Sequence, residues 1–65
     1  MSFDVFVSKV SEIFANEGKE PSVRNDRENG LYLAKCGEWR LMLNPNSKHA
    51  RLYNVRSKFN ASVEM

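Results

Sequence analysis

Few residues of this chain have side chains suited to nucleophilic or metal chemistry. His49 is the only histidine and Cys36 is the only cysteine. A structural zinc site needs four ligands, so these two residues cannot form one. In the strand register described below they lie on different strands at opposite ends of a hairpin, which argues against a Cys–His nucleophile pair. We therefore expect a surface imidazole and a turn thiol.

The nearest pair of carboxylates, Asp26 and Glu28, lies in the most polar segment of the chain. General acid catalysis needs an apolar wall that raises the pKa of a carboxyl group, and this segment offers none. The two carboxylates are better explained as balancing the charges of Arg24 and Arg27. The three glycines are isolated and form no phosphate-binding loop. The sequence predicts a protein that is not an enzyme and that uses no metal or cofactor.

Arginine and tyrosine side chains in the second half of the chain suit a different chemistry, the binding of anions. Residues 39–65 hold five Lys or Arg and one Glu, a sum of +4, whereas residues 1–38 hold five Lys or Arg and seven Asp or Glu, a sum of −2. This asymmetry favours an anionic partner. Arginine beside aromatic residues suits unpaired bases and phosphates, and the same residue types dominate protein–protein hot spots.

The candidate binding residues lie on one face of the predicted sheet or in the basic segments beside it. They are Tyr32, Arg40, Met42, Lys48, His49, Arg51, Tyr53, Arg56 and Lys58. In the expected register Arg40 stands directly opposite Arg51, and a bound anion would relieve their repulsion. The alternative is an ordinary solvated face, because antiparallel sheets commonly present one side to water.

Two antiparallel hairpins in series are expected to position these side chains. Runs at about residues 31–35, 38–43 and 48–55 are rich in the aromatic and aliphatic residues that favour strands. Gly37 is expected as the left-handed third residue of a three-residue loop, Lys35 to Gly37, between the first two runs. Pro45 fits the second position of the turn that leads to the third run. The sequence thus predicts a three-stranded meander at the centre of the fold.

Side-chain alternation along these strands predicts one dry face. The expected register pairs Leu33 with Trp39 and Trp39 with Leu52. The predicted core face then holds Leu31, Leu33, Trp39, Leu41, Leu43, Ala50 and Leu52, and the outer face holds Tyr32, Glu38, Arg40, Met42, His49, Arg51 and Tyr53.

An amphipathic helix at about residues 3–17 is expected to cover the dry face. Its apolar side chains recur at spacings of three and four and form one stripe: Phe3, Phe6, Val7, Val10, Ile13 and Phe14. Ser2 suits the N-cap and Gly18 suits the C-terminal cap. We therefore predict an α+β fold in a single domain, residues 1–65, with an N-terminal amphipathic helix packed on a small antiparallel β-meander of three to five strands.

Two flanking segments allow alternative interpretations. Residues 22–28 are expected as an edge strand because Asn29-Gly30 favours a type I′ turn, with a loop as the alternative. Residues 59–64 alternate in polarity and are expected as a second edge strand. Residues 47–59 are expected as strand, with a helix capped by Ser47 as the alternative.

The helical alternative carries a resemblance to a known family. One helix, three strands and a helix opening with Ser47-Lys48-His49-Ala50-Arg51 would resemble the double-stranded RNA-binding domain, whose last helix opens with a Ser-Lys-Lys-like step. His49 stands in place of the second Lys, and Asn44-Pro45-Asn46 stands in place of a Gly-rich lead-in. The resemblance covers the element order and this one short segment, so no binding residue is carried over from it.

Size and composition set the expected class of function. A chain of 65 residues buries only about 60% of its unfolded surface, which leaves little room for an enclosed substrate pocket. A lone cysteine and the absence of a long apolar run predict a cytoplasmic protein that does not enter a membrane. We expect a small phage- or plasmid-type interaction protein, a regulator or inhibitor that docks onto a larger protein with an acidic surface. The alternative is a module that binds DNA or RNA through its basic C-terminal half, and exposed strand edges also allow a homodimer.

Overall fold

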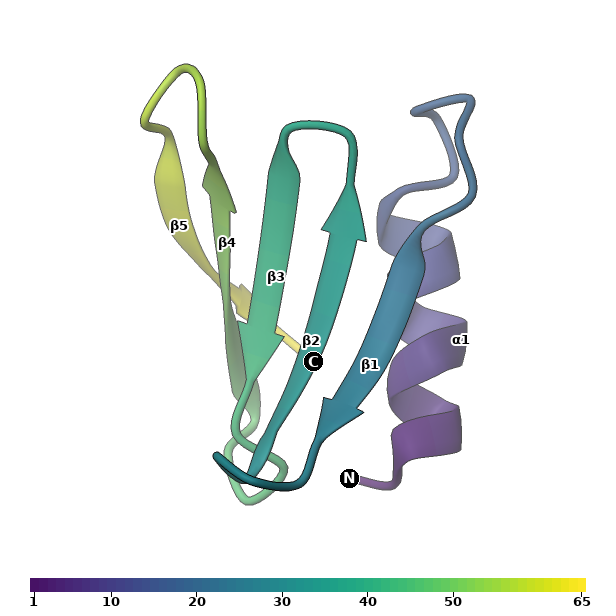
Figure 1. The fold of residues 1–65 in the computed structure, drawn as a ribbon, viewed down its shortest axis with the longest axis vertical. Helices are drawn as coiled ribbons and strands as arrows, with labels where there is room; N and C mark the ends of the chain where they lie inside the picture. The colour runs from purple at the N-terminus through teal and green to yellow at the C-terminus, as the bar shows by residue number, and fades with distance from the viewer.

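The structure, a computed structural model, describes all 65 residues as one helix and five strands (Figure 1). The elements in chain order are α1 (Phe3–Ile13), β1 (Ser22–Asp26), β2 (Leu31–Cys36), β3 (Trp39–Leu43), β4 (His49–Asn54) and β5 (Asn60–Glu64). The strands form a single antiparallel sheet in the order β1-β2-β3-β4-β5. The predicted α+β fold with a helix on an antiparallel meander is confirmed. The helical alternative for residues 47–59 is wrong, and with it the final helix on which the resemblance depended.

Helix α1 begins where the sequence predicts and ends earlier. The side chain of Ser2 accepts a hydrogen bond from the backbone N–H of Val5 (3.2 Å), which satisfies one of the free donors at the helix start. The helix ends at Ile13 rather than near residue 17, and Gly18 adopts φ +71 in the turn that follows. Asn16 and Gly18 are poor helix formers, so the helix is not sustained to that point. Helix α1 is neither long nor apolar enough to span a membrane.

The core lies between helix α1 and the sheet. Helix α1 packs along β1 and β2, and its buried side chains meet buried residues of β2, β3 and β4. Burial of each large apolar side chain contributes about 1.5–3 kcal/mol to folding. The buried cluster consists of Phe6, Val10, Phe14, Ala34, Cys36, Leu41, Leu43 and Ala50. No element covers the other face of the sheet (Figure 1).

The hairpin between β2 and β3 is tighter than predicted. Cys36 pairs with Trp39, so the loop consists of Gly37 and Glu38 alone. Gly37 has φ +60 and Glu38 has a negative φ, the pattern of a type II′ turn, in which glycine favours the first position. The prediction of a three-residue loop that includes Lys35 is wrong.

The shorter loop shifts β2 by three residues relative to β3, and an odd shift exchanges the two faces of a strand. Tyr32, Ala34 and Cys36 therefore face helix α1 and pack in or against the core. Leu31 and Leu33 lie on the opposite face of the sheet. The prediction that placed these two leucines in the core and Tyr32 on the outer face is wrong.

The register between β3 and β4 differs from the prediction by two residues, which keeps every side chain on its predicted face. Arg40 lies opposite Tyr53, and Met42 lies opposite Arg51. The predicted pairing of Arg40 with Arg51 is wrong. Arg40 nevertheless faces another cation, because Lys35 of β2 lies directly opposite it on its other side.

Candidate functional site

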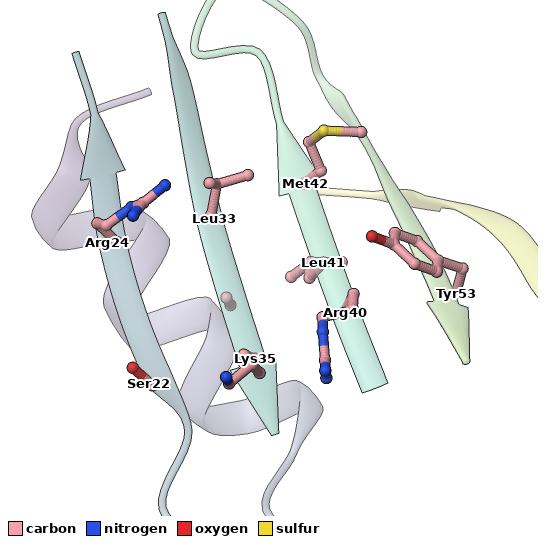
Figure 2. A pocket seen from close by; sticks show the side chains of 9 residues that line it. Ser22, Arg24, Leu33, Lys35, Arg40, Leu41, Met42 and Tyr53 are labelled. Carbon is pink, nitrogen blue, oxygen red and sulfur yellow. The ribbon is translucent and has the colours of Figure 1, made fainter. Parts of the chain in front are cut away.

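The face of the sheet opposite helix α1 carries a shallow hollow that crosses the first four strands (Figure 2). Its volume is about 290 Å³. We call it the outer hollow, and its lining residues are Ser22, Arg24, Leu33, Ala34, Lys35, Arg40, Leu41, Met42 and Tyr53. Longer basic and aromatic side chains surround a shorter aliphatic centre, so a side chain of a partner could enter between them.

The floor of the outer hollow is apolar. Leu33 and Met42 lie directly opposite one another on β2 and β3. Met42 retains 37% of its surface exposed, so its side chain adds accessible apolar area to this floor. Tyr53 reaches from β4 toward β3 and borders the same floor (Figure 2). A ligand seated here would bury aliphatic and aromatic area.

The rim of the outer hollow is cationic. Arg24, Lys35 and Arg40 line it, and no carboxylate does. Lys35 and Arg40 are a directly opposed cross-strand pair, and neither takes part in an ion pair of the protein. Like charges in this position repel each other, so the isolated sheet holds a local electrostatic cost that an anion would remove.

The guanidinium group of Arg40 is held in place by the β2–β3 turn. Its Nη1 donates to the backbone carbonyl oxygens of Gly37 (2.7 Å) and Trp39 (2.9 Å). A guanidinium group has five N–H donors, and the Nε and Nη2 groups of Arg40 have no partner in the protein. The side chain is thus positioned in advance with donors that remain free for a carboxylate or phosphate.

Arg24 is partly balanced by a neighbour on its own strand. Its Nη2 lies 3.7 Å from Asp26 Oδ2, and the Arg24 side chain is 72% exposed. The Asp26 carboxylate is engaged mainly by Asn29, whose backbone N–H (3.3 Å) and Nδ2 (2.9 Å) donate to it. The hydrogen bond from the Asn29 side chain, with smaller contributions from its backbone and from the Arg24 charge, lowers the pKa of Asp26 below its ordinary value. Arg24 therefore keeps most of its surface available at the rim.

Five of the predicted binding residues share the outer face, and three of them line the hollow. Arg40, Met42 and Tyr53 are lining residues. His49 and Arg51 lie on the same face of β4 but outside the hollow, and Arg51 Nη1 donates to Asn60 Oδ1 (2.8 Å). The structure therefore brings three of the predicted residues together at the hollow, whose lining also includes residues of β1 and β2.

Tyr32 is not part of this face. Its ring packs edge-on against Phe3 (centroids 5.2 Å apart) and at a tilt against Phe6 (5.4 Å). Its hydroxyl donates to the backbone carbonyl oxygen of Met1 (3.3 Å). The structure thus places Tyr32 between helix α1 and the sheet, where it stabilises their packing.

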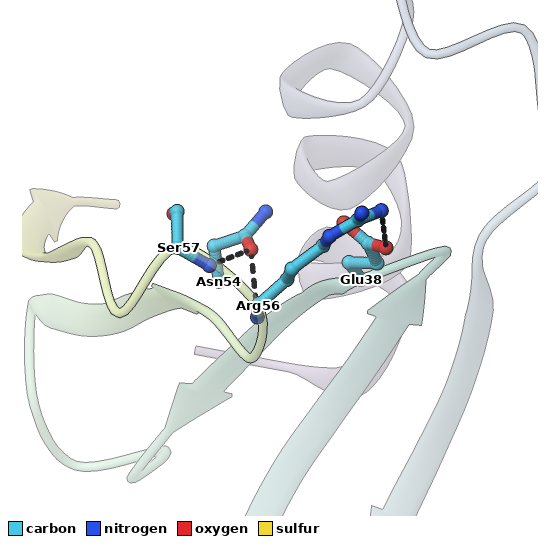
Figure 3. A network of polar contacts seen from close by, with 4 residues as sticks. All are labelled: Glu38, Asn54, Arg56 and Ser57. Carbon is cyan, nitrogen blue, oxygen red and sulfur yellow. Dashed lines mark hydrogen bonds and ion pairs between the residues drawn. The ribbon is translucent and has the colours of Figure 1, made fainter.

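The remaining predicted residues lie in turns at the two ends of the sheet. Lys48 precedes β4 in the β3–β4 turn, whereas Arg56 and Lys58 lie in the β4–β5 turn. Arg56 Nη1 is 3.3 Å from Glu38 Oε1, and its backbone N–H donates to Asn54 Oδ1 (2.9 Å), so Arg56 connects two turns (Figure 3). These three cations do not line the outer hollow.

The sequence does not predict six of the nine lining residues of the outer hollow: Ser22, Arg24, Leu33, Ala34, Lys35 and Leu41. The expected three-residue loop places Lys35 within the loop and Leu33 in the core. The signal that could have found them is Gly37 followed by Glu38, since Gly-X is a common two-residue hairpin turn. Arg24 is the central residue of β1, whereas the sequence pattern explains it only as local charge balance.

The residues considered for nucleophilic chemistry lie apart. Cys36 is 3% exposed at the end of β2, and its thiol points to the backbone carbonyl oxygen of Lys19 (3.7 Å). His49 is exposed at the start of β4, on the opposite face of the sheet. No His, Cys, Asp and Glu side chains gather in a group of three or more that could hold a metal ion. The arrangement of the outer hollow suits binding, through an apolar floor and free cationic donors.

No protein family, curated protein or solved structure matches this chain.

Proposed function

We propose that this protein is a small, non-enzymatic binding module whose outer hollow docks onto an acidic surface segment of a larger protein, which it regulates or inhibits. The observation that carries the proposal is the composition of the hollow, three cations and no carboxylate around an exposed apolar floor. The chemistry favours a segment in which an apolar side chain is flanked by Asp or Glu. The apolar side chain would cover Met42 and Leu33 while the carboxylates meet Lys35 and Arg40.

The size of the outer hollow supports a protein partner. At about 290 Å³ it is at the lower limit of small-molecule pockets, and it is open along one side of the sheet. A shallow site gains most of its affinity from one or two anchors inserted by a larger surface. Arg and Tyr, both present here, are among the residues most enriched in such hot spots.

Nucleic-acid binding is the second candidate function, and fewer features of the structure support it. Binding of single strands uses several aromatic platforms on which successive bases stack. With Tyr32 packed against helix α1, Tyr53 is the only aromatic residue of the outer hollow. The basic turn residues Lys48, Arg56 and Lys58 lie outside the hollow, so they do not form one continuous basic surface with it.

The setting of this activity is also a proposal. We place the protein in the cytoplasm of a cell that carries a phage or plasmid, as a regulator of a host protein. The support is the lone, buried Cys36, which suits a reducing compartment, and the small size of the chain. A module of this size acts by occupying a surface of its partner.

The test compares two double variants with the same change in net charge. Arg24→Gln with Lys35→Gln removes two rim cations, and Lys48→Gln with Lys58→Gln removes two turn cations. Tagged wild type and both variants are used to recover partners from host lysate, with and without nuclease, after circular dichroism has shown that all three are folded. We expect a protein that stays bound after nuclease, is retained by the turn variant and is lost by the rim variant.

Two results would overturn the proposal. Equal recovery by both variants would show that the outer hollow is not the docking site. Loss of all partners after nuclease, with affinity falling linearly in log–log terms as salt rises, would establish the nucleic-acid alternative, because phosphate contacts release counterions.

A further inference from the structure

The free edge of β5 is the second feature that points to a partner. β5 pairs only with β4, and no other strand lies beside it. Asn54 N–H donates to the carbonyl oxygen of Phe59 (3.0 Å), and Met65 N–H donates to that of Lys48 (2.8 Å). In an antiparallel ladder, hydrogen-bonded pairs alternate with non-bonded ones. The odd-numbered residues 59–65 thus bond to β4, and the backbone groups of the even-numbered residues 60–64 point to the open edge.

We propose that β5 pairs with β5 of a second copy of this chain, antiparallel and about a two-fold axis at Ser62. In this register Asn60 lies opposite Glu64 of the second copy, and the two Ser62 residues face one another. All three open-edge residues then form hydrogen-bonded pairs, each of which exchanges two bonds. An axis at Ala61 or at Val63 would leave only two such pairs within the strand.

The side chains of β5 are compatible with this pairing on the outer face of the sheet. Asn60 Oδ1 accepts from Arg51 Nη1 (2.8 Å), and Asn60 Nδ2 is a free donor without a partner in the protein. The residue opposite Asn60 in the second copy is Glu64, whose carboxylate accepts such a bond. The two Glu64 residues are themselves separated by four positions along the ladder, about 13 Å, so they do not oppose the contact.

The inner face of β5 is compatible as well. The same register sets Ala61 opposite Val63, and Phe59 opposite Met65, with one member from each copy. Phe59 is 49% exposed even though its ring packs edge-on against Trp39 (centroids 5.7 Å apart). Pairing of the two copies would therefore cover apolar surface that one copy leaves open to water.

The other sheet edge, β1, is less suited to self-pairing. Pro21 directly precedes it, and Arg24 is its central residue, so a two-fold axis there would set two guanidinium groups opposite one another. β5 contains no Lys and no Pro, and Glu64 is its only charge. Charged side chains and Pro usually protect natural edge strands that stay unpaired, and β5 carries less of this protection than β1.

Sedimentation equilibrium and cysteine cross-linking test this pairing. Wild type should sediment with twice its 7.5 kDa chain mass at high micromolar concentration. Ser62→Lys, which sets two ammonium groups at the axis, should return it to a monomer, whereas the matched turn variant Ser57→Lys should not. Circular dichroism and thermal unfolding show whether Ser62→Lys is folded.

The cross-link reports on the register and does not depend on a disruptive variant. Under mild oxidation Ser62→Cys should form a disulfide-linked dimer, because residues in a hydrogen-bonded pair have Cα atoms about 5.5 Å apart, within disulfide range. Glu64→Cys is the matched control and should not cross-link, since its two copies lie about 13 Å apart. Wild-type monomers at every concentration, or equal cross-linking of the two cysteine variants, would overturn the proposal.

Discussion

Lys35 of β2 lies directly opposite Arg40 of β3, and neither side chain has an acidic partner. Two cations in this relationship weaken the sheet slightly. Arg40 nevertheless donates hydrogen bonds to the carbonyl oxygens of Gly37 and Trp39, and these bonds keep its guanidinium group at the rim of the hollow. The pair thus combines a small cost to the free protein with free donors for an anion.

Removal of the Lys35 charge should therefore stabilise the free protein while it weakens binding. We expect Lys35→Gln to raise the free energy of unfolding by about 0.2–0.5 kcal/mol at low ionic strength, in the range of a cross-strand pair. The gain should vanish in high salt, which screens exposed charges. Urea unfolding at two salt concentrations measures it, with Lys48→Gln in the β3–β4 turn as the control. A loss of stability at low salt would contradict the assigned register.

Truncation of the two tyrosines should affect stability and partner binding to different degrees. Tyr32→Ala removes a ring that packs on Phe3 and Phe6, and we expect a loss of about 2–3 kcal/mol, somewhat below the cost for a fully buried aromatic residue. Tyr53→Ala removes a ring from the open outer face and should cost less than about 1 kcal/mol while weakening partner binding. Denaturant unfolding and the recovery assay separate these effects. Equal destabilisation by both variants would contradict the assignment of faces.

The helix and the central meander were predictable from the sequence because two of their signals were unambiguous. The apolar stripe of residues 3–14 has helical spacing only, and Pro45 marks the β3–β4 turn clearly. In residues 31–36 the periodicity fits either face, because Leu31 and Leu33 alternate with Tyr32, Ala34 and Cys36, and both sets are apolar. Only the length of the following loop decides between them, and a one-residue error there exchanges the faces.

This ambiguity also determined how much of the candidate site could be predicted. Arg40, Met42 and Tyr53 come from strands whose faces were assigned correctly, and they line the outer hollow. Lys35 and Leu33 come from β2. The incorrect loop prediction excluded them from the predicted binding face and placed Tyr32 on it. The hollow itself depends on the relative heights of side chains from four strands, which no local sequence pattern reports.

Lys58 offers a route to a more stable protein. It is the only residue other than glycine with a positive φ (+68), a conformation that costs an L-residue roughly 1 kcal/mol. We expect Lys58→Gly to raise the free energy of unfolding by about 0.5–1 kcal/mol, even though glycine has more conformational freedom in the unfolded chain. Lys48→Gly is the control and should destabilise, because Lys48 has no positive φ. Thermal unfolding of the two variants measures the difference, and a lower midpoint for Lys58→Gly would contradict the turn geometry.

Asp26 should make the stability of the protein depend on pH in the acid range. The hydrogen bonds from Asn29 lower its pKa below the ordinary value of 3.8, so just below pH 3.8 the folded state binds fewer protons than the unfolded state. The stabilisation is therefore complete above pH 3.8 and is lost as the pH falls through the lowered pKa. In Asp26→Asn the acid side of the curve of unfolding free energy against pH should become flatter.

Glu28→Gln is the matched control. It removes a carboxylate of the same turn that accepts no hydrogen bond, so it should keep the wild-type slope. Urea unfolding from pH 2 to 7 tests both variants, and an unchanged slope in Asp26→Asn would show that its contacts with Asn29 do not persist in solution.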